Sequence, residues 1–195
     1  MTSTSAASGT AYEKLLSAAR VLFYNHGLNG TGIDAIVKRA GVAKKSLYNN
    51  FASKDELVAA YLRVRHEEWI SLYQKRLQTA MTARERVMAV FYAYQDHAEF
   101  VYENGFRGCG LLNAAAELPA GSPGRIAVRE HKEEVEAILA THLAELMNGN
   151  TESARFMARH FAFLLEGSIS RAGLEGNSNC VAQAGAIAEQ IMEAY

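Results

Sequence analysis

The chain of 195 residues predicts an all-α protein with about nine helices and no convincing strand. Only two prolines interrupt it, so little in the sequence prevents helices from forming. Apolar residues recur at intervals of three and four, which is the period of an amphipathic helix. A repeated capping motif, in which threonine or serine stands three residues ahead of a carboxylate, marks helix starts at Thr10, Thr31, Ser53 and Thr82.

The N-terminal part of the chain predicts three helices. The first runs from Thr10 to about His26. The second begins at the Thr31 motif and ends at Gly41, because glycine readily adopts the left-handed conformation that closes a helix. The third spans residues 43–51. Two short helices joined by a tight glycine turn indicate a helix-turn-helix, the unit that inserts its second helix into the major groove of DNA.

The predicted third helix carries an unusual set of polar side chains. Lysine provides charge for phosphates, serine and tyrosine donate hydrogen bonds to phosphate oxygens, and asparagine can form a bidentate contact with adenine. A merely solvated polar helix would look similar, but the preceding helix and glycine turn favour a recognition helix. The candidate DNA-binding residues are Thr31, Lys44, Lys45, Ser46, Tyr48, Asn49, Asn50 and Lys54. Which asparagine faces the groove stays open.

Residues 12–58 resemble the DNA-binding domain of TetR-family transcriptional repressors. The matching features are Ala18, Ala19, Leu22, Phe23, Gly27, Thr31, Ala40-Gly41-Val42, Leu47-Tyr48, Phe51, Lys54 and Leu57. Two positions depart from the family pattern: Ala43 replaces the usual capping serine, and Lys45 stands where a small residue is usual. Loss of a capping hydroxyl costs about 1 kcal/mol, and the extra lysine adds charge near the phosphates. Both changes bear on which operator is read.

The net charge of −1 is divided unevenly along the chain. Residues 1–54 carry seven basic side chains against two acidic ones, a net charge of +5, so residues 55–195 carry −6. A basic footprint at one end is expected of a protein that binds duplex DNA there. The two cysteines form no C-x-x-C pair, and residues 1–9 lack the apolar core of a signal peptide. With no apolar run of about 20 residues, we expect a cytoplasmic protein without a membrane span.

The remaining predicted helices cover residues 54–80, 83–103, 111–118, 123–147, 153–173 and 179–195. Ser53 and Thr82 cap the first two. Ser122 precedes Pro123, which is tolerated at the first helical position because its missing N–H would have no partner there. The apolar residues expected to mark helix 153–173 are Phe156, Phe163, Leu164 and Ile169.

Three functions are compatible with a helical C-terminal part. A metal site needs clustered ligands, but no histidine has a glutamate three residues before it, and His66-Glu67 lacks the second histidine of a zinc protease motif. An enzyme needs a nucleophile with its base or a phosphate cradle, and the glycines of residues 105–110 follow a helix rather than a strand. A sensing domain needs only an apolar cavity with polar anchors. We therefore predict no catalytic residue, no metal and no cofactor.

Residues 107–118, followed by Glu130-His131-Lys132, are similar to the corresponding region of a TetR subgroup whose effectors vary widely. The candidate ligand-binding residues are Trp69, Tyr73, Phe91, Tyr94, Phe100, Cys109, Asn113, Glu117, His131, Phe163 and Glu166. Aromatic residues at helical spacing are also typical of a plain core, so about half of these are expected to line no cavity. Cys109 could be a reactive thiol, but an inert buried cysteine is favoured because only Arg107 lies near it in sequence.

The predicted organisation is a flexible arm at 1–9, a helix-turn-helix DNA-binding domain at 10–57, and a larger helical ligand-binding and dimerisation domain at 58–195. The resemblance implies a homodimeric repressor that leaves its palindromic operator DNA when a small-molecule effector binds. The residues alone support only a DNA-binding protein. The alternative is a helical ligand- or protein-binding module whose helix-turn-helix serves protein contacts. We expect the last two helices to form the dimer, through Ala184, Gly185, Ala188, Phe161, Leu164, Leu165 and Ile191.

Overall fold

The computed structural model describes residues 9–195, and this part of the chain contains nine α-helices and no strand. The expected arm at residues 1–9 lies outside the described residues except for Gly9. The N-terminal helices are α1 (Ala11–His26), α2 (Ile33–Ala40), α3 (Lys44–Asn50) and α4 (Lys54–Leu77). The others are α5 (Ala83–Ala98), α6 (Gly110–Glu117), α7 (Pro123–Leu146), α8 (Thr151–Glu175) and α9 (Asn179–Met192). Within residues 9–195, no helix is both long and apolar enough to cross a membrane.

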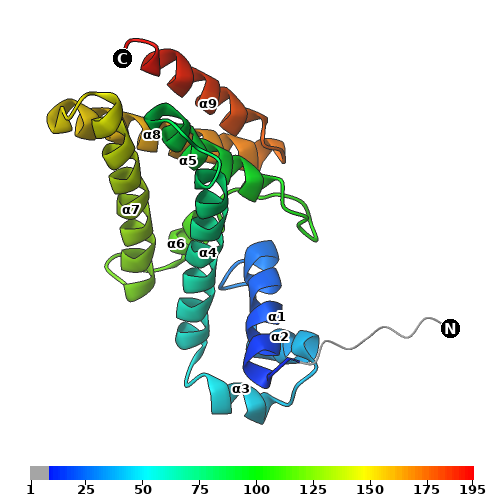
Figure 1. Cartoon of the computed structure of the whole chain (residues 1–195). Coiled ribbons are helices and arrows are strands. Elements are labelled where there is room, and N and C mark those ends of the chain that lie inside the picture. Colours follow the sequence, from blue (N-terminus) through cyan, green and yellow to red (C-terminus); the bar gives the residue numbers. More distant parts are fainter. Residues whose placement is uncertain (1–8) are drawn as a thin grey trace.

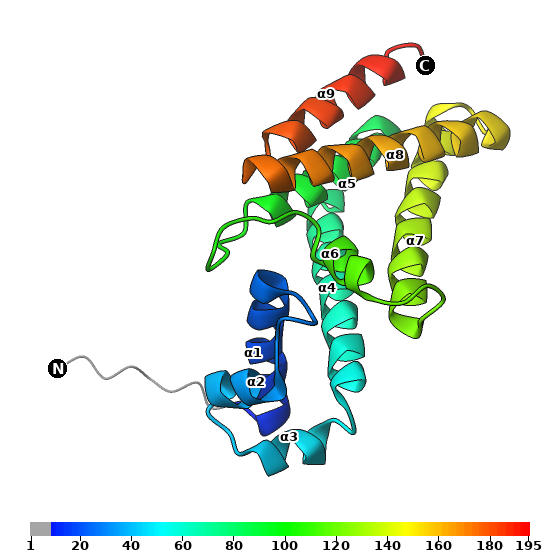
Figure 2. The same cartoon turned by 180° about the vertical axis from the view of Figure 1, so that it is seen from behind.

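The helix α4 connects the two ends of the molecule (Figure 1). At one end, α1, α2 and α3 form a small group, with α3 outermost. At the other end, α8 and α9 pack with α5 and α7. Seen from behind, the loop that joins α5 to α6 hangs over the C-terminal end of α1 (Figure 2). The all-α fold class is confirmed.

Three of the four predicted capping motifs are formed. Thr10 and Thr82 each form a full capping box, in which the hydroxyl accepts one backbone N–H and the glutamate accepts another. The hydroxyl of Ser53 caps α4. The prediction that Thr31 caps a helix is wrong. Its hydroxyl donates to two backbone carbonyls, and α2 begins after Gly32 without a side-chain cap.

The predicted helix 83–103 is too long at its C-terminal end. The helix α5 stops at Ala98 because the hydroxyl of Tyr102 turns back and donates to the carbonyl of His97 at 2.9 Å. A side chain that satisfies a terminal carbonyl takes the place of the next helical turn. The residues 99–109 then form the loop over α1.

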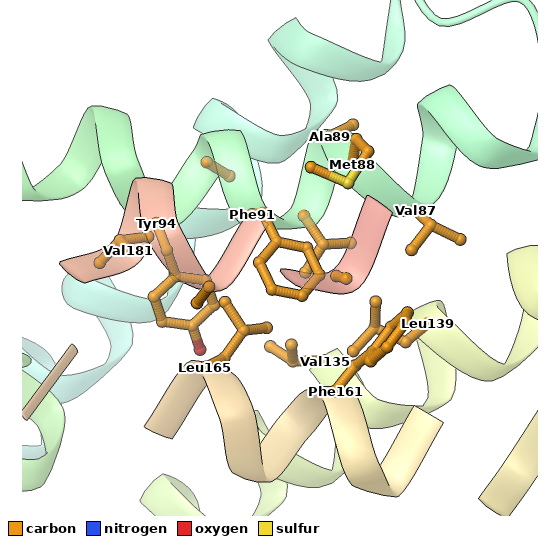
Figure 3. Close-up of a cluster of buried hydrophobic side chains, with 14 of the residues drawn as sticks. Val87, Met88, Ala89, Phe91, Tyr94, Val135, Leu139, Phe161, Leu165 and Val181 are labelled. Carbon is orange, nitrogen blue, oxygen red and sulfur yellow. The ribbon is translucent and has the colours of Figure 1, made fainter. Parts of the chain in front are cut away.

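Two clusters of buried side chains stabilise the fold. The first cluster contains side chains from all four N-terminal helices, α1, α2, α3 and α4, and it includes Leu111 of α6 and Val128 of α7. The second fills the space between α5, α7, α8 and α9, where Phe91 meets Phe161 edge to face at 5.8 Å (Figure 3). Cys109 packs against both clusters. The N-terminal core therefore continues past residue 57 and rests directly on the helical bundle.

The helix α8 has an apolar face that the bundle does not cover. Ile169 is buried, as its pattern predicts, and so is Leu165, which was expected at the dimer interface. Phe156 and Phe163 instead point outward, with exposed fractions of 75% and 68%. Their spacing of seven residues puts them on one face, together with the exposed Leu174. The sequence period alone could not say which of the two apolar faces turns inward.

Candidate nucleic-acid interface and effector site

The helix α3 presents one polar face to solvent at the tip of the molecule (Figure 1). Leu47 is fully buried, and Phe51, just after the helix, stacks on Tyr12 of α1 at 4.9 Å. These contacts fix the rotation of α3. The exposed side chains are Lys44, Lys45, Tyr48 and Asn49.

The Lys44 ammonium already has an acidic partner on the neighbouring helix. Its Nζ lies 2.8 Å from Oδ1 of Asp34 in α2, and this hydrogen bond raises the pKa of Lys44. Both side chains are exposed, so the pair is worth little to stability. It links α3 to α2 at the surface of the helix-turn-helix.

The two adjacent asparagines lie in different environments. The side chain of Asn50 donates to the carbonyl of Ser46 at 2.7 Å and is half-buried. Asn49 is exposed on the outer face of α3. Of the two amides, only that of Asn49 is directed away from the protein in a position to meet a base edge.

Two of the predicted DNA-binding residues have partners inside the protein. Thr31 is 2% exposed, and its hydroxyl donates to the carbonyls of Leu22 at 3.1 Å and Gly27 at 2.7 Å. The ammonium of Lys54 donates to the carbonyl of Leu28 at 2.6 Å. Both residues hold the turn between α1 and α2. Thr31 is therefore removed from the predicted DNA contacts, because its buried hydroxyl cannot reach a phosphate oxygen.

Four of the predicted ligand-binding residues gather inside the bundle. Trp69 stacks on Tyr73 with ring centroids 5.6 Å apart, and it meets Tyr94 at 5.4 Å and His131 at 5.5 Å. The indole N–H of Trp69 is buried without a hydrogen-bond partner in the described part of the chain. Burial lowers the pKa of His131 to about 3, so this cluster holds a neutral histidine.

A charged group adjoins these aromatics. The Lys132 ammonium lies 2.8 Å from Glu166, 3.2 Å from the Tyr94 hydroxyl and 3.8 Å from the Cys109 sulfur. Burial alone would lower the pKa of Lys132, but these neighbours raise it. A small hollow of about 120 Å³ opens onto Lys132 and Glu166 between α7 and α8, with Phe163 at its edge. Lys132 was missed because a lone lysine on a predicted helix usually faces solvent.

The other predicted ligand-binding residues have different neighbours. Phe91 is part of the hydrophobic core, and Phe100 is 41% exposed on the loop after α5. Asn113 is exposed and donates to the carbonyl of Arg107 at 3.0 Å. Glu117 turns toward α1, where it accepts two backbone N–H groups. The spacing of these residues in the sequence does not reveal which face of the bundle each one occupies. The packing of the helices decides it.

A buried polar cluster also escaped the sequence analysis. Arg65 is 5% exposed and bonds to Glu68 at 2.9 Å, to the Tyr102 hydroxyl at 3.2 Å and to His97 at 2.5 Å. Burial, with Arg65 beside it, holds the pKa of His97 well below its usual range. A signal was present: Arg65 stands four residues from both Tyr61 and Trp69, on the buried stripe of α4.

A helix-turn-helix that presents lysine, tyrosine and asparagine outward defines a DNA-binding protein of the helix-turn-helix class. Residues 15–61 match the family model described as bacterial regulatory proteins, tetR family. This match shows a DNA-binding domain of the TetR-family type at residues 15–61.

Curated relatives cover only part of this chain. It is 34% identical over 100 residues to the transcriptional activator FasR of Mycolicibacterium smegmatis, spanning 48% of this chain and 46% of FasR. It is 33% identical over 81 residues to the transcriptional repressor KstR2 of the same organism, spanning 42% of this chain and 40% of KstR2. The chain thus matches less than half the length of either relative.

Solved structures match along nearly the whole chain. A TetR-family regulator from Streptomyces coelicolor superimposes with a TM-score of 0.83 at 27% identity, covering 93% of both chains. The regulatory protein TetR from Rhodobacter sphaeroides gives a TM-score of 0.78 at 22% identity, covering 93% of this chain and 98% of that one. At that identity the second match shows a common fold alone.

Proposed function

We propose that this protein is a sequence-specific transcriptional regulator, a repressor that a small-molecule effector releases from its operator. The observation that carries the proposal is the outward face of α3, with Lys44, Lys45, Tyr48 and Asn49 at the tip of the molecule. Ser46 flanks this face and completes the proposed DNA contacts, whereas Asn50 has committed its amide to the Ser46 carbonyl. Since these contacts require the chromosome, we place the protein in the cytoplasm.

The sign of regulation rests on a physical argument, since FasR is named an activator and KstR2 a repressor. A repressor needs only to occupy the promoter, and an outward recognition helix provides that. An activator also needs a surface that contacts the polymerase. In the described part of the chain, the outward face of α3 supports the first requirement, which is occupation of the promoter.

The proposed assembly is a homodimer through the outer faces of α8 and α9. Two recognition helices must be held about 34 Å apart, or a multiple of that, to read adjacent major grooves. An unpaired apolar face of this length would favour association. The proposed contacts are the exposed residues Phe156, Phe163, Leu174 and Ile187.

The dimer contacts expected from the sequence need correction. Ala184 and Ala188 are buried within the protomer, and a Cβ on Gly185 would stand 3.2 Å from Met88 of α5. Phe161 and Leu165 are buried in the bundle core as well. Small residues of α9 therefore allow a close approach of α5 rather than of a partner chain.

The proposed effector site is the interior around Trp69, Tyr73, Tyr94 and His131, with Lys132 and Glu166 as polar anchors. Buried polar atoms without partners, namely the Trp69 indole N–H and Oε2 of Glu166, support a ligand that supplies them. An effector here would contact α4, which leads directly to α3 (Figure 1). The effector and operator would then compete through a coupling of about 1–3 kcal/mol, equal in both directions.

The test is a selection of bound fragments from random DNA duplexes, followed by salt titration of the enriched sequence. We expect a palindrome whose half-sites are about one helical turn apart and an affinity that falls steeply with salt. No enrichment, with salt-independent binding to a protein partner instead, would support the alternative of a protein-contact module.

A further inference from the structure

The turn that follows α1 is held by a carboxylate from α6. Glu117 accepts the backbone N–H of Leu28 at 2.9 Å and that of Asn29 at 2.7 Å. Gly27 has a φ of +80°, and a Cβ there would stand 2.4 Å from Glu117, so glycine is needed for this approach. On the other side, Lys54 donates to the carbonyl of Leu28 at 2.6 Å. The Leu28–Asn29 peptide group is thus held by both α6 and the start of α4.

The carbonyl groups at the end of α1 have a second partner. The guanidinium of Arg107 donates to the carbonyl of Tyr24 at 2.9 Å and to that of Asn25. The Arg107 backbone N–H donates to the Tyr24 hydroxyl at 2.6 Å, and this hydroxyl donates to the carbonyl of Gly108 at 3.1 Å. A cation is favoured here because a helix C-terminus carries partial negative charge.

The same loop is also fixed to the C-terminal helices. A Cβ at Gly173 would lie 2.6 Å from the Cα of Gly108, so the loop backbone packs directly on α8. At the other end of the loop, Glu99 accepts a hydrogen bond from the Ser178 hydroxyl at 2.8 Å, just before α9. Close packing transmits displacement. Residues 99–109 therefore connect α8 and α9 to the end of α1.

We propose that Glu117 and Arg107 are positioning residues, which set the angle of the helix-turn-helix on the bundle and so the spacing of half-sites that a dimer reads. The consequence for DNA rests on the proposed function, whereas the angle itself can be measured without DNA. Were α4 the sole link, the helix-turn-helix could swing about its N-terminal end. The contacts of Glu117 and Arg107 add to the packing of Leu111 on the N-terminal core and restrict that swing. They act at the C-terminal end of α1, about the length of one helix from the α3–α4 junction.

The direct measurement is the distance between spin labels at Ala35→Cys in α2 and Glu152→Cys in α8, both exposed positions. All samples carry serine in place of the native cysteines, and unlabelled protein in excess isolates the distances within one protomer. We expect Glu117→Gln and Arg107→Met to widen the distance distribution at least twofold. The exposed Glu130→Gln on α7 is the matched control and should leave it unchanged.

An exposed ion pair provides a variant that does not endanger folding. Arg39 of α2 binds Glu103 of the loop through two hydrogen bonds, of 3.2 and 2.5 Å. Glu103→Arg should widen the same distribution, and adding Arg39→Glu should narrow it again by restoring the pair. Unchanged widths in all of these variants would overturn the proposal, even if DNA binding were lost.

Binding to operators of altered spacing tests the consequence for DNA. Glu117→Gln should keep its affinity for a single half-site within twofold, lose about tenfold on the selected palindrome, and tolerate one or two inserted base pairs better than the parent. An equal loss on half-site and palindrome would indicate local damage to the helix-turn-helix and contradict a positioning role. If the parent binds no duplex, the proposed function fails, and the label distances still decide the role of Glu117 and Arg107.

Discussion

At the scale of single residues, the partner of each side chain determines its role more than its chemical type. Asn49 and Asn50 are identical in type and adjacent in sequence, but Asn50 has committed its amide to the carbonyl of Ser46. Thr31 and Lys54 are polar residues within a DNA-binding unit, but they stabilise its α1–α2 turn. Burial and internal hydrogen bonds thus separate the proposed DNA contacts from the residues that stabilise the fold.

Replacing Asn49 by alanine should remove base discrimination at one operator position. A bidentate contact is worth about 1–3 kcal/mol of preference for the right base, so we expect about tenfold or more loss of discrimination there. Asn50→Ala is the matched control, and it should leave sequence preference unchanged. Competition with operators substituted at single positions measures both variants. Equal effects of the two changes would argue against Asn49 as the reading residue.

Acid should destabilise the protein through its buried histidines. The folded pKa of His131 is lowered to about 3 by burial, while the unfolded value is about 6.5. The unfolded chain therefore binds the proton first, and stability that is complete above pH 6.5 falls as the pH drops toward 3. A single such histidine contributes a slope of about 1.4 kcal/mol per pH unit, and His97, whose pKa is also lowered, adds to it.

Urea unfolding at several pH values between 7.5 and 5 measures this slope. His131→Phe keeps an aromatic ring against Trp69. It should lower the slope of the unfolding free energy against pH by the contribution of one buried histidine. His26→Gln, at an exposed position, is the control. A slope that His131→Phe does not alter would show that another group carries the acid sensitivity.

At the scale of helices, α3 is the element with the least local support. It has seven residues, and its N-cap is Ala43, which provides no side-chain hydrogen bond. Isolated helices of this length are unstable in water, so α3 depends on the burial of Leu47 and on its neighbours. The recognition helix is therefore stabilised mainly by tertiary contacts.

Ala43→Ser should stabilise the helix-turn-helix by about 1 kcal/mol, because the backbone at Ala43 is already extended, as an N-cap requires. The rise in urea midpoint measures this gain. Ala59→Ser, at an exposed position in the second turn of α4, is the control and should give no gain. A fall in stability with Ala43→Ser would mean that the serine side chain cannot reach the free N–H groups.

The salt dependence of DNA binding should distinguish Lys44, the first residue of α3, from Lys54, the first residue of α4. Lys44 is exposed, so Lys44→Ala should lower the slope of log affinity against log salt by about 0.9, the effect of one phosphate contact. Lys54→Ala should leave the slope unchanged, because its ammonium is bound to Leu28. A lower slope for Lys54→Ala would return Lys54 to the DNA contacts.

At the scale of the whole molecule, the position of the uncovered apolar face predicts the assembly. Phe156→Glu introduces charge into the outer face of α8 and should give monomers in sedimentation at micromolar concentration. Ala188→Glu should instead lower the stability of the protomer, since Ala188 is fully buried beside α5. Ile126→Glu, exposed on α7, controls for the added charge. A Phe156→Glu protein that stays dimeric would move the interface elsewhere.

The sequence by itself determined what depends on residues near one another in the chain. Helical period, the capping boxes at Thr10 and Thr82, and the left-handed Gly41 each involve at most about four residues, so their spacing reveals them. The recognition helix and the burial of Leu47 follow from the same local pattern. For this reason the fold class and the tip that carries the proposed DNA contacts could be predicted.

Tertiary structure alone decided what depends on residues distant in the chain. Glu117 meets Leu28 across 89 residues, and Lys132 meets Tyr94 across 38. The choice of which apolar face of α8 stays uncovered also depends on its neighbours. A helical period states that a side chain lies on a given face, but the partner of that face is set by packing of the whole chain. The positioning contacts of α1 and the anchors of the proposed effector site therefore became visible only in three dimensions.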